Sequence, residues 1–285
     1  METARPNPSQ TDDSRAALVV AHPGHELLVH HWMETVRPLY YCLTDGSGKE
    51  GVGRLESTRR LLKSTGATQG PIYGRLTDNQ VYQALLEGQS EIFTDLAKEL
   101  TRSLLTHEVE VLSGDAPEGI NPTHDLCRFL IDEAVKVVEQ ISGRQVRNYE
   151  FALESPPTDC HKELISEALW LHLDEEALDR KLQAAMNYTE LRGETEEGLR
   201  LFGKQAFALE CLRPSTTRMV MENFEREPPT YERIGQEGIE RFGKKFGQYE
   251  QVITFQGHVK PVMQAIKLAC QSLVSEYESS ESATP

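Results

Sequence analysis

Short apolar runs that alternate with helical patterns are the feature that most constrains the fold of this chain. Runs of this kind occupy residues 16–21, 39–43 and 109–112, with a shorter one at 70–73. Continuous apolar runs of about four to eight residues are consistent with strands that are buried on both faces. The first half of the chain therefore contains four predicted strands.

Helical patterns separate these strands. They cover residues 25–36, 54–64 and 79–105, the last with a break near Gly88. Beyond the fourth strand, apolar residues recur at helical spacing from Leu126 to Ile141. Strands that alternate with helices predict an α/β fold in which a mostly parallel sheet is covered on both faces.

The sequence pattern of the second half differs from that of the first half and predicts a mainly helical extension. Residues 145–153 and 252–255 read as strands, 161–202 as mainly helical, and 259–277 as an apolar-striped helix. The interpretation is a disordered lead-in over 1–14, a core over 15–155, an extension packed on that core over 156–275, and a disordered tail over 276–285. The alternative is that both parts share a single apolar core.

The acidic composition argues against nucleic acids and anionic membrane surfaces as binding partners. The chain has 285 residues and a formal charge of −15, whereas nucleic acids and anionic membrane surfaces attract clustered Lys and Arg. No apolar stretch reaches the roughly 18 residues of a membrane-spanning helix, and residues 1–14 lack the apolar segment of a secretory signal. The five scattered cysteines form no C-x-x-C pair. We expect a cytoplasmic protein that acts on small molecules. The sequence is compatible with both a monomer and a homo-oligomer.

Histidines follow two of the predicted strands. His22 and His25 come directly after the first strand, and His124 lies in the polar segment after the fourth. Ligands of open parallel sheets bind outside the carboxyl ends of the strands, where these segments would meet. Three imidazole ligands with one free coordination position suit a catalytic zinc ion. Other first-row divalent metals are alternatives, since imidazole also binds them. Asp45, Asp115 and Asp125 also lie at strand ends and are candidate catalytic carboxylates.

The segment 21–26, Ala-His-Pro-Gly-His-Glu, resembles the AHPDDE signature of the LmbE-like (PIG-L) metal-dependent N-deacetylases. Weaker matches follow in order: Arg54 with Gly66, then Asn-Pro-Thr-His at 121–124 for HPDH, then a helix that begins at Lys181. The resemblance covers roughly residues 15–215. It implies a Rossmann-like sheet, a zinc ion held by His22, His25 and His124, and removal of acetyl groups from sugar-like substrates.

His25 replaces an Asp of the signature but keeps a metal ligand, and two other departures from the family pattern matter more. Gly24 replaces the Asp that serves the family as general base, and Asn121 replaces the His that steadies the oxyanion. Asn121 can still donate a hydrogen bond to an oxyanion, but Gly24 cannot accept a proton. Three neutral imidazoles would leave the metal more positive than a set with one Asp, and so would acidify bound water further. Asp45, Asp115 and Asp125 are the alternative bases.

Substrate contacts are expected from Arg54, by resemblance to the family, and from His258, which follows the predicted strand 252–255. The leading hypothesis is a metal-dependent hydrolase that deacetylates a sugar-like metabolite. Two alternatives stay open: a family member that binds a ligand without hydrolysis, and a metal hydrolase that acts on an ester or other linkage.

Overall fold

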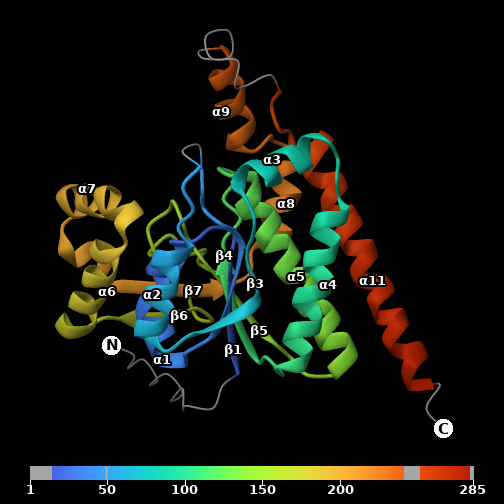
Figure 1. The fold of residues 1–285 in the computed structure, drawn as a ribbon, viewed down its shortest axis with the longest axis horizontal. Coiled ribbons are helices and arrows are strands. Elements are labelled where there is room, and N and C mark those ends of the chain that lie inside the picture. Colours follow the sequence, from blue (N-terminus) through green and yellow to red (C-terminus); the bar gives the residue numbers. More distant parts are fainter. Residues whose placement is uncertain (1–14, 49–50, 241–250, 283–285) are drawn as a thin grey trace.

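The computed structural model describes residues 15–48, 51–240 and 251–282, which form a seven-stranded sheet with helices on both faces (Figure 1). The strands are β1 Ala16–Val20, β2 Leu39–Thr44, β3 Thr68–Leu76, β4 Val111–Asp115, β5 Arg147–Phe151, β6 Leu169–His172 and β7 Leu209–Pro214. The predicted α/β class is confirmed. Within the described ranges, none of the helices combines the length and apolar content that a bilayer-spanning segment requires.

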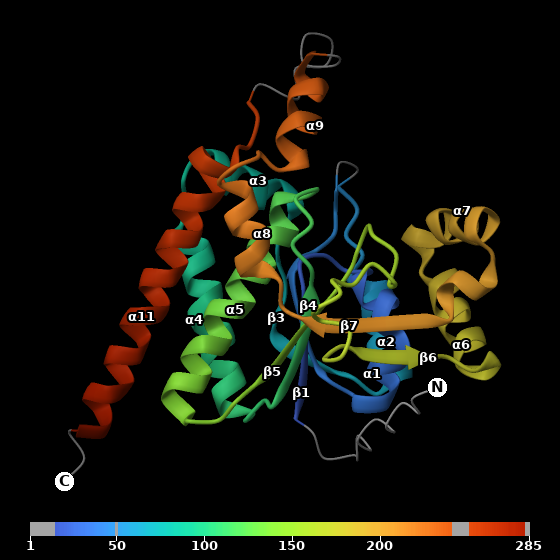
Figure 2. The ribbon, with the colours of Figure 1, turned by 180° about the vertical axis from the view of Figure 1, so that it is seen from behind.

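The strand order brings the segments that follow β1, β2 and β4 to the same edge of the sheet. Along the sheet the order is β3-β2-β1-β4-β5-β7-β6. Strands β1 to β5 are parallel to one another, whereas β7 is antiparallel to both β5 and β6 (Figure 2). The chain order reverses at β1, which lies between β2 and β4. Open α/β sheets bind ligands at such a reversal, beyond the carboxyl ends of the strands.

Helices form a layer on each face. Helices α4, α5 and α11 cover one face, and α1, α2 and α6 lie on the other (Figures 1 and 2). The α-helices are α1 His30–Val36, α2 Leu55–Thr65, α3 Asp78–Leu86, α4 Glu91–Thr106, α5 Pro122–Ser142, α6 Glu175–Asn187, α7 Arg192–Phe202, α8 Thr217–Phe224, α9 Thr230–Gly238 and α11 Lys260–Ser282. Shorter turns are η1 His25–Val29, η2 Thr189–Leu191, η3 Lys204–Phe207 and the π-helical turn η5 Phe255–Val259.

Strand alternation divides the apolar core between the two layers. Val19 of β1 packs with α4, α5 and α11, whereas Leu18 packs with Trp32 of α1 on the opposite face. Each fully buried side chain of this kind contributes about 1.5–3 kcal/mol. Ile266 of α11 belongs to the same core as Val19. The second half of the chain therefore shares its core with the first.

Several predicted boundaries need correction. Residues 252–255, predicted as a strand, pair with no strand among the described residues. Residues 252–254 have no regular secondary structure and Phe255 begins η5, because Ile253 and Phe255 pack into the helical layer. The range 161–202, predicted as mainly helical, contains β6. Residues 276–282, assigned to a disordered tail, continue α11. The predicted lead-in over 1–14 lies outside the described residues. The break near Gly88 is confirmed and separates α3 from α4.

A buried arginine joins α5 to the second half of the sheet. The Arg128 guanidinium is fully buried and donates to the Tyr149 carbonyl at 2.8 Å and to the Asp132 carboxylate at 2.6 Å. Burial acts to raise the pKa of Asp132, but the Arg128 charge together with side-chain hydrogen bonds to the carboxylate lowers it. Replacing Arg128 by Met leaves Asp132 buried without its cation. We expect the free energy of unfolding at pH 7 to fall by about 3–5 kcal/mol.

The loss should depend on pH. A depressed carboxyl pKa contributes stability above the unfolded-state pKa of about 4, and this stability is lost as the pH falls through the folded-state pKa. Urea unfolding of Arg128→Met should therefore show a smaller deficit in acid than at pH 7. The matched control is Arg218→Met, whose side chain is 95% exposed, with a change below about 0.5 kcal/mol. Equal losses in the two variants at pH 7 would contradict the prediction.

Candidate functional site

Three imidazoles meet at the carboxyl edge of the sheet. His22 follows β1, His25 begins η1, and His124 lies in the first turn of α5. The ring centres are 5.4 Å apart for His22 and His25, 5.0 Å for His22 and His124, and 4.7 Å for His25 and His124. The structure thus brings the three histidines together, while their role as metal ligands stays a prediction.

Local sequence explains how α5 presents His124. Asn121 is the N-cap residue, and its side-chain oxygen accepts a hydrogen bond from the Thr123 amide at 2.9 Å. Pro122 occupies the first turn, where a missing amide proton costs no helical hydrogen bond. The Asn121 amide nitrogen lies 3.5 Å from Nε2 of His22. The same residue therefore starts the helix and faces the imidazole cluster.

Carboxylates hold two of the three rings. Nδ1 of His22 lies 2.8 Å from Oδ1 of Asp78 and 2.8 Å from the Thr44 hydroxyl. Nδ1 of His25 lies 3.0 Å from Oδ2 of Asp115, which also accepts the Ala21 amide at 2.7 Å. Hydrogen bonds of this kind fix the tautomer and orientation of metal-ligating histidines. Sequence reasoning missed Asp78, and it placed Asp115 among the candidate bases.

The charges of the cluster are set by burial and by these carboxylates. Burial opposes protonation of His25, but Asp115 outweighs burial and raises the pKa of His25. Burial and the nearby His25 and His22 rings hold the pKa of His124 well below its usual range. Burial acts to raise the pKa of Asp78, but the hydrogen bond and charge of His22 lower it strongly. His124 is therefore neutral at pH 7, which leaves its lone pair available.

The cluster offers ligands without forming a complete coordination sphere. Among the residues that the structure describes, no group of three or more His, Cys, Asp or Glu side chains is arranged to hold a metal ion. The chemistry of the donor set nevertheless fits a metal, because carboxylates hold Nδ1 of His22 and His25 and His124 is neutral. In addition, Oδ1 of Asp115 is buried and has no partner among the described atoms.

Gly24 lies between the histidines in a conformation that suits glycine. Its φ is 109°, and a Cβ atom there would lie 2.4 Å from Cδ1 of Leu191 in η2 and 3.8 Å from the Tyr188 hydroxyl. The place that the family's general base would occupy is thus covered by the segment that joins α6 to α7. Both the positive φ and the packing of Leu191 therefore favour glycine at position 24.

Glu26 is a structural anchor of the loop that carries the histidines. Its fully buried carboxylate accepts the Gly24 amide at 2.7 Å, the Thr58 hydroxyl at 2.7 Å and the Tyr40 hydroxyl at 3.0 Å. Burial raises the pKa of Glu26. Three donors converge on this carboxylate, so it holds the 22–26 loop against β2 and α2.

Lys181 and Glu210 hold the same region from the other side. The buried Lys181 ammonium donates to the Leu28 carbonyl and to Glu210, each at 2.9 Å. Glu210 also accepts the amides of His31 and Trp32, both at 2.9 Å. Helix α6, which begins at Glu175 and not at Lys181 as the resemblance implied, therefore supports η1 and α1 beneath the site.

The other predicted site residues are Arg54, Asp45, Asp125 and His258, and the structure gives them different surroundings. Arg54 precedes α2, and its charge lies close enough to oppose protonation of His25. Asp45 caps its own turn by accepting the Ser47 amide at 2.9 Å, and buried Asp125 accepts the Gly119 amide at 3.1 Å. His258 accepts the Thr254 amide at 3.0 Å within η5, because the expected strand before it does not form. Arg54 is thus beside the cluster, whereas His258 caps a helical turn.

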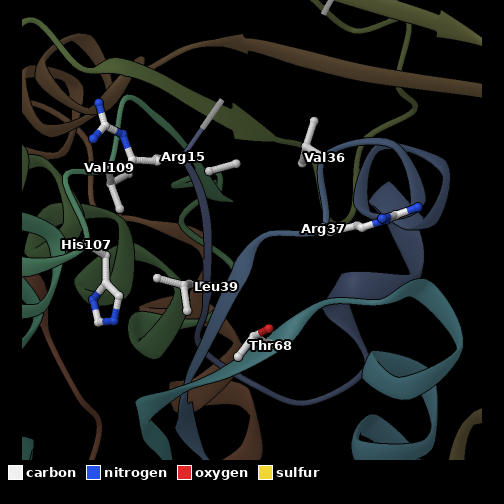
Figure 3. Close-up of a pocket in the computed structure, with 8 residues that line it drawn as sticks. Arg15, Val36, Arg37, Leu39, Thr68, His107 and Val109 are labelled. Carbon is white, nitrogen blue, oxygen red and sulfur yellow. The ribbon is translucent and has the colours of Figure 1, made fainter. Parts of the chain in front are cut away.

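A cavity of about 260 Å³ lies at the opposite edge of the sheet (Figure 3). Its lining includes Ala16, Leu39 and Thr68, which begin β1, β2 and β3. The histidines lie beyond the carboxyl ends of the same sheet. The Arg15 guanidinium at its rim pairs with Glu108 and Glu110. This cavity is therefore separate from the imidazole cluster.

No protein-family model matches this sequence, and no curated protein sequence matches it. Solved structures are similar at low identity. The A40926 pseudoaglycone deacetylase Dbv21 aligns at 15% identity over 71% of this chain and 97% of that chain, with a TM-score of 0.45. A deacetylase of the teicoplanin biosynthesis pathway, in complex with bog, aligns at 13% over 70% and 97%, with a TM-score of 0.49. The zinc-inhibited form of teicoplanin deacetylase Orf2 aligns at 12% over 70% and 97%, with a TM-score of 0.47.

Proposed function

We propose that this chain is a metal-dependent hydrolase that removes the acyl group from an N-acylated, sugar-like small molecule. The observation that carries the proposal is the cluster of His22, His25 and His124, with ring centres 4.7–5.4 Å apart at the edge where such sheets bind ligands. The resemblance of residues 21–26 to the AHPDDE signature supports the same reaction class. The acidic composition supports a small-molecule substrate rather than a nucleic acid.

The three histidines would hold the metal, with zinc the first choice for an imidazole set. A zinc ion there would supply Lewis-acid polarisation of an acyl carbonyl and acidification of water. Asp78 and Asp115 hold Nδ1 of His22 and His25, so they position these rings. Asn121 donates from the helix start toward the cluster and can stabilise an oxyanion. Arg54 supplies a positive charge for a substrate oxygen.

Burial and backbone hydrogen bonds argue against the three candidate carboxylates as the proton acceptor. Asp115 and Asp125 are 0% and 1% exposed and accept backbone amides, so we assign them positioning roles instead of contact with substrate. Asp45 accepts the Ser47 amide in its own turn. Activation of water would then depend on the charge of the three-imidazole site in place of a dedicated carboxylate.

A second candidate function is ligand binding without hydrolysis. It is favoured by Gly24, because Leu191 covers the place of the family's base. The two functions differ in turnover. A panel of N-acetylated amino sugars, incubated with the zinc-loaded protein, should release acetate if the chain is a deacylase. A raised melting temperature with no acetate release from any sugar would favour the binding function instead. Cleavage of acetate esters alone would favour the ester alternative.

Asp78→Asn should weaken zinc binding without unfolding the protein. Asparagine keeps the size of the side chain but removes the negative charge that holds Nδ1 of His22. Loss of such a carboxylate typically lowers metal affinity 10–100-fold, and we expect a decrease of about that size. Competition with a chromogenic chelator measures it.

The matched control is Asp95→Asn, at an exposed position of α4 remote from the histidines in the chain. Its zinc affinity should equal that of the unmodified protein. If Asp78→Asn binds zinc as tightly as Asp95→Asn does, then Asp78 does not position a metal ligand.

A further inference from the structure

One face of β7 carries two polar side chains that the proposed function does not use. Glu210 and Leu212 point toward α1, where Glu210 binds the amides of His31 and Trp32. Side chains alternate along a strand, so Cys211 and Arg213 lie on the opposite face. Both are buried, at 6% and 9% exposure. A different part of the chain must therefore cover them.

The loop between β5 and β6 covers this face. The Arg213 guanidinium donates to the carbonyl of Asp159. Trp170, which pairs with Cys211 across β6 and β7, donates its indole N–H to the Ile165 carbonyl at 3.1 Å. These two hydrogen bonds hold the loop on either side of Cys160. The loop that carries Cys160 is therefore held over the face of β7 that carries Cys211, and each of the two thiols affects the pKa of the other.

We propose that Cys160 and Cys211 form a reversible disulfide when the protein meets a peroxide. The Cys160 thiolate attacks the O–O bond, which gives a Cys160 sulfenic acid and one water. The Cys211 thiolate then attacks the Cys160 sulfur, the S–S bond forms, and the sulfenic oxygen leaves as a second water. Two thiols and one peroxide thus become one disulfide and two waters. This modification is independent of the proposed hydrolase activity.

Accessibility favours this pair over the other cysteines. Cys160 is half-buried and so can meet an oxidant, whereas Cys42, Cys127 and Cys270 are 0–1% exposed. Partial burial raises the pKa of Cys160, and the adjacent Arg213 acts in the opposite direction. Oxidation should therefore be faster at mildly alkaline pH, where more thiolate is present.

The bond would fasten a loop that starts beside the candidate site. The Glu118 carboxylate, in the segment between β4 and α5, accepts the amides of Leu153 and Glu154 at 2.9 Å and of Ser155 at 3.0 Å. The same loop continues to Cys160. A disulfide to β7 would therefore anchor the far end of a loop whose near end is already held by Glu118.

Peptide mapping of the full chain after hydrogen peroxide treatment tests the proposal. Trypsin places Cys160 in the peptide 148–162 and Cys211 in the peptide 205–218, because Pro214 blocks cleavage after Arg213. We expect a crosslink between these two peptides as the main product, two thiols lost per chain, and full reversal by dithiothreitol. The melting temperature of the oxidised protein should rise by about 5 °C or more.

Serine variants provide the controls. Cys160→Ser and Cys211→Ser should each abolish the crosslink, and Cys270→Ser, in the helical layer, should leave it unchanged. If peroxide instead leaves Cys160 as sulfinic or sulfonic acid with Cys211 still free, the proposal is wrong. It is also wrong if the crosslink joins other cysteines, or if it persists in either of the first two variants.

Discussion

A variant with both His22→Ala and His124→Ala is expected to lose stoichiometric zinc. The unmodified protein, equilibrated with zinc and then desalted, should retain about one equivalent, as a site with three imidazole ligands would. Removal of two of the three ligands leaves His25 alone, and a single imidazole does not hold zinc through desalting. We expect less than about 0.1 equivalent in the variant by elemental analysis.

Thermal unfolding gives an independent measure of the same loss. A metal that binds only the folded state raises the melting temperature by mass action, so added zinc should stabilise the unmodified protein and not the double variant. His107→Ala is the matched control, since His107 is exposed near the amino ends of the strands. Equal zinc content in the double variant and the control would overturn the assignment of these histidines.

Gly24→Asp, which introduces the first acidic residue of the AHPDDE signature, is expected to destabilise the protein by about 2–5 kcal/mol. A side chain at Gly24 must adopt a φ of 109° and must displace Leu191, whose Cδ1 lies 2.4 Å from the new Cβ. Both effects act on the folded state. Chemical denaturation measures the loss, and we expect no gain in deacylase activity because the loop must distort to admit the carboxylate.

A control and a second variant separate the backbone effect from the steric effect. Gly48→Asp also requires a positive φ, of 53°, but no atom of the described residues lies within 4 Å of its Cβ position, so only the backbone cost of about 1 kcal/mol should remain. Leu191→Ala combined with Gly24→Asp should recover the steric part, which a double-mutant cycle measures. Equal losses for Gly24→Asp and Gly48→Asp would show that Leu191 does not constrain this position.

The first half of the fold was predictable because its strands are buried on both faces. Continuous apolar residues in β1 and β2 leave a clear signal, and the helix from Leu126 to Ile141 is regular. Strand β7 gave no such signal, since its apolar run is interrupted by Glu210 and Arg213. Those buried charges pair with Lys181 and Glu150, and these partners are remote in sequence.

The candidate site was predictable where residues directly follow strands. His22, His25 and His124 were expected to meet for that reason, and they do. Asp78 was missed because the third strand was drawn to end at residue 73, whereas β3 extends to Leu76. With the longer strand, Asp78 would have joined the residues at strand ends. His258 illustrates the opposite error, because a β-branched run was taken for a strand that has no partner.

The position of Glu210 in the chain has a consequence for synthesis on the ribosome. A nascent chain that has emerged through α5 already contains all three histidines and the parallel strands that carry them. It lacks the carboxylate that binds the amides of His31 and Trp32 and the ammonium of Lys181. The first helix after the histidine motif therefore stays incompletely secured until β7 is made. We therefore expect co-translational assembly of the candidate site to be a late event, although its histidines are among the earlier residues to be synthesised.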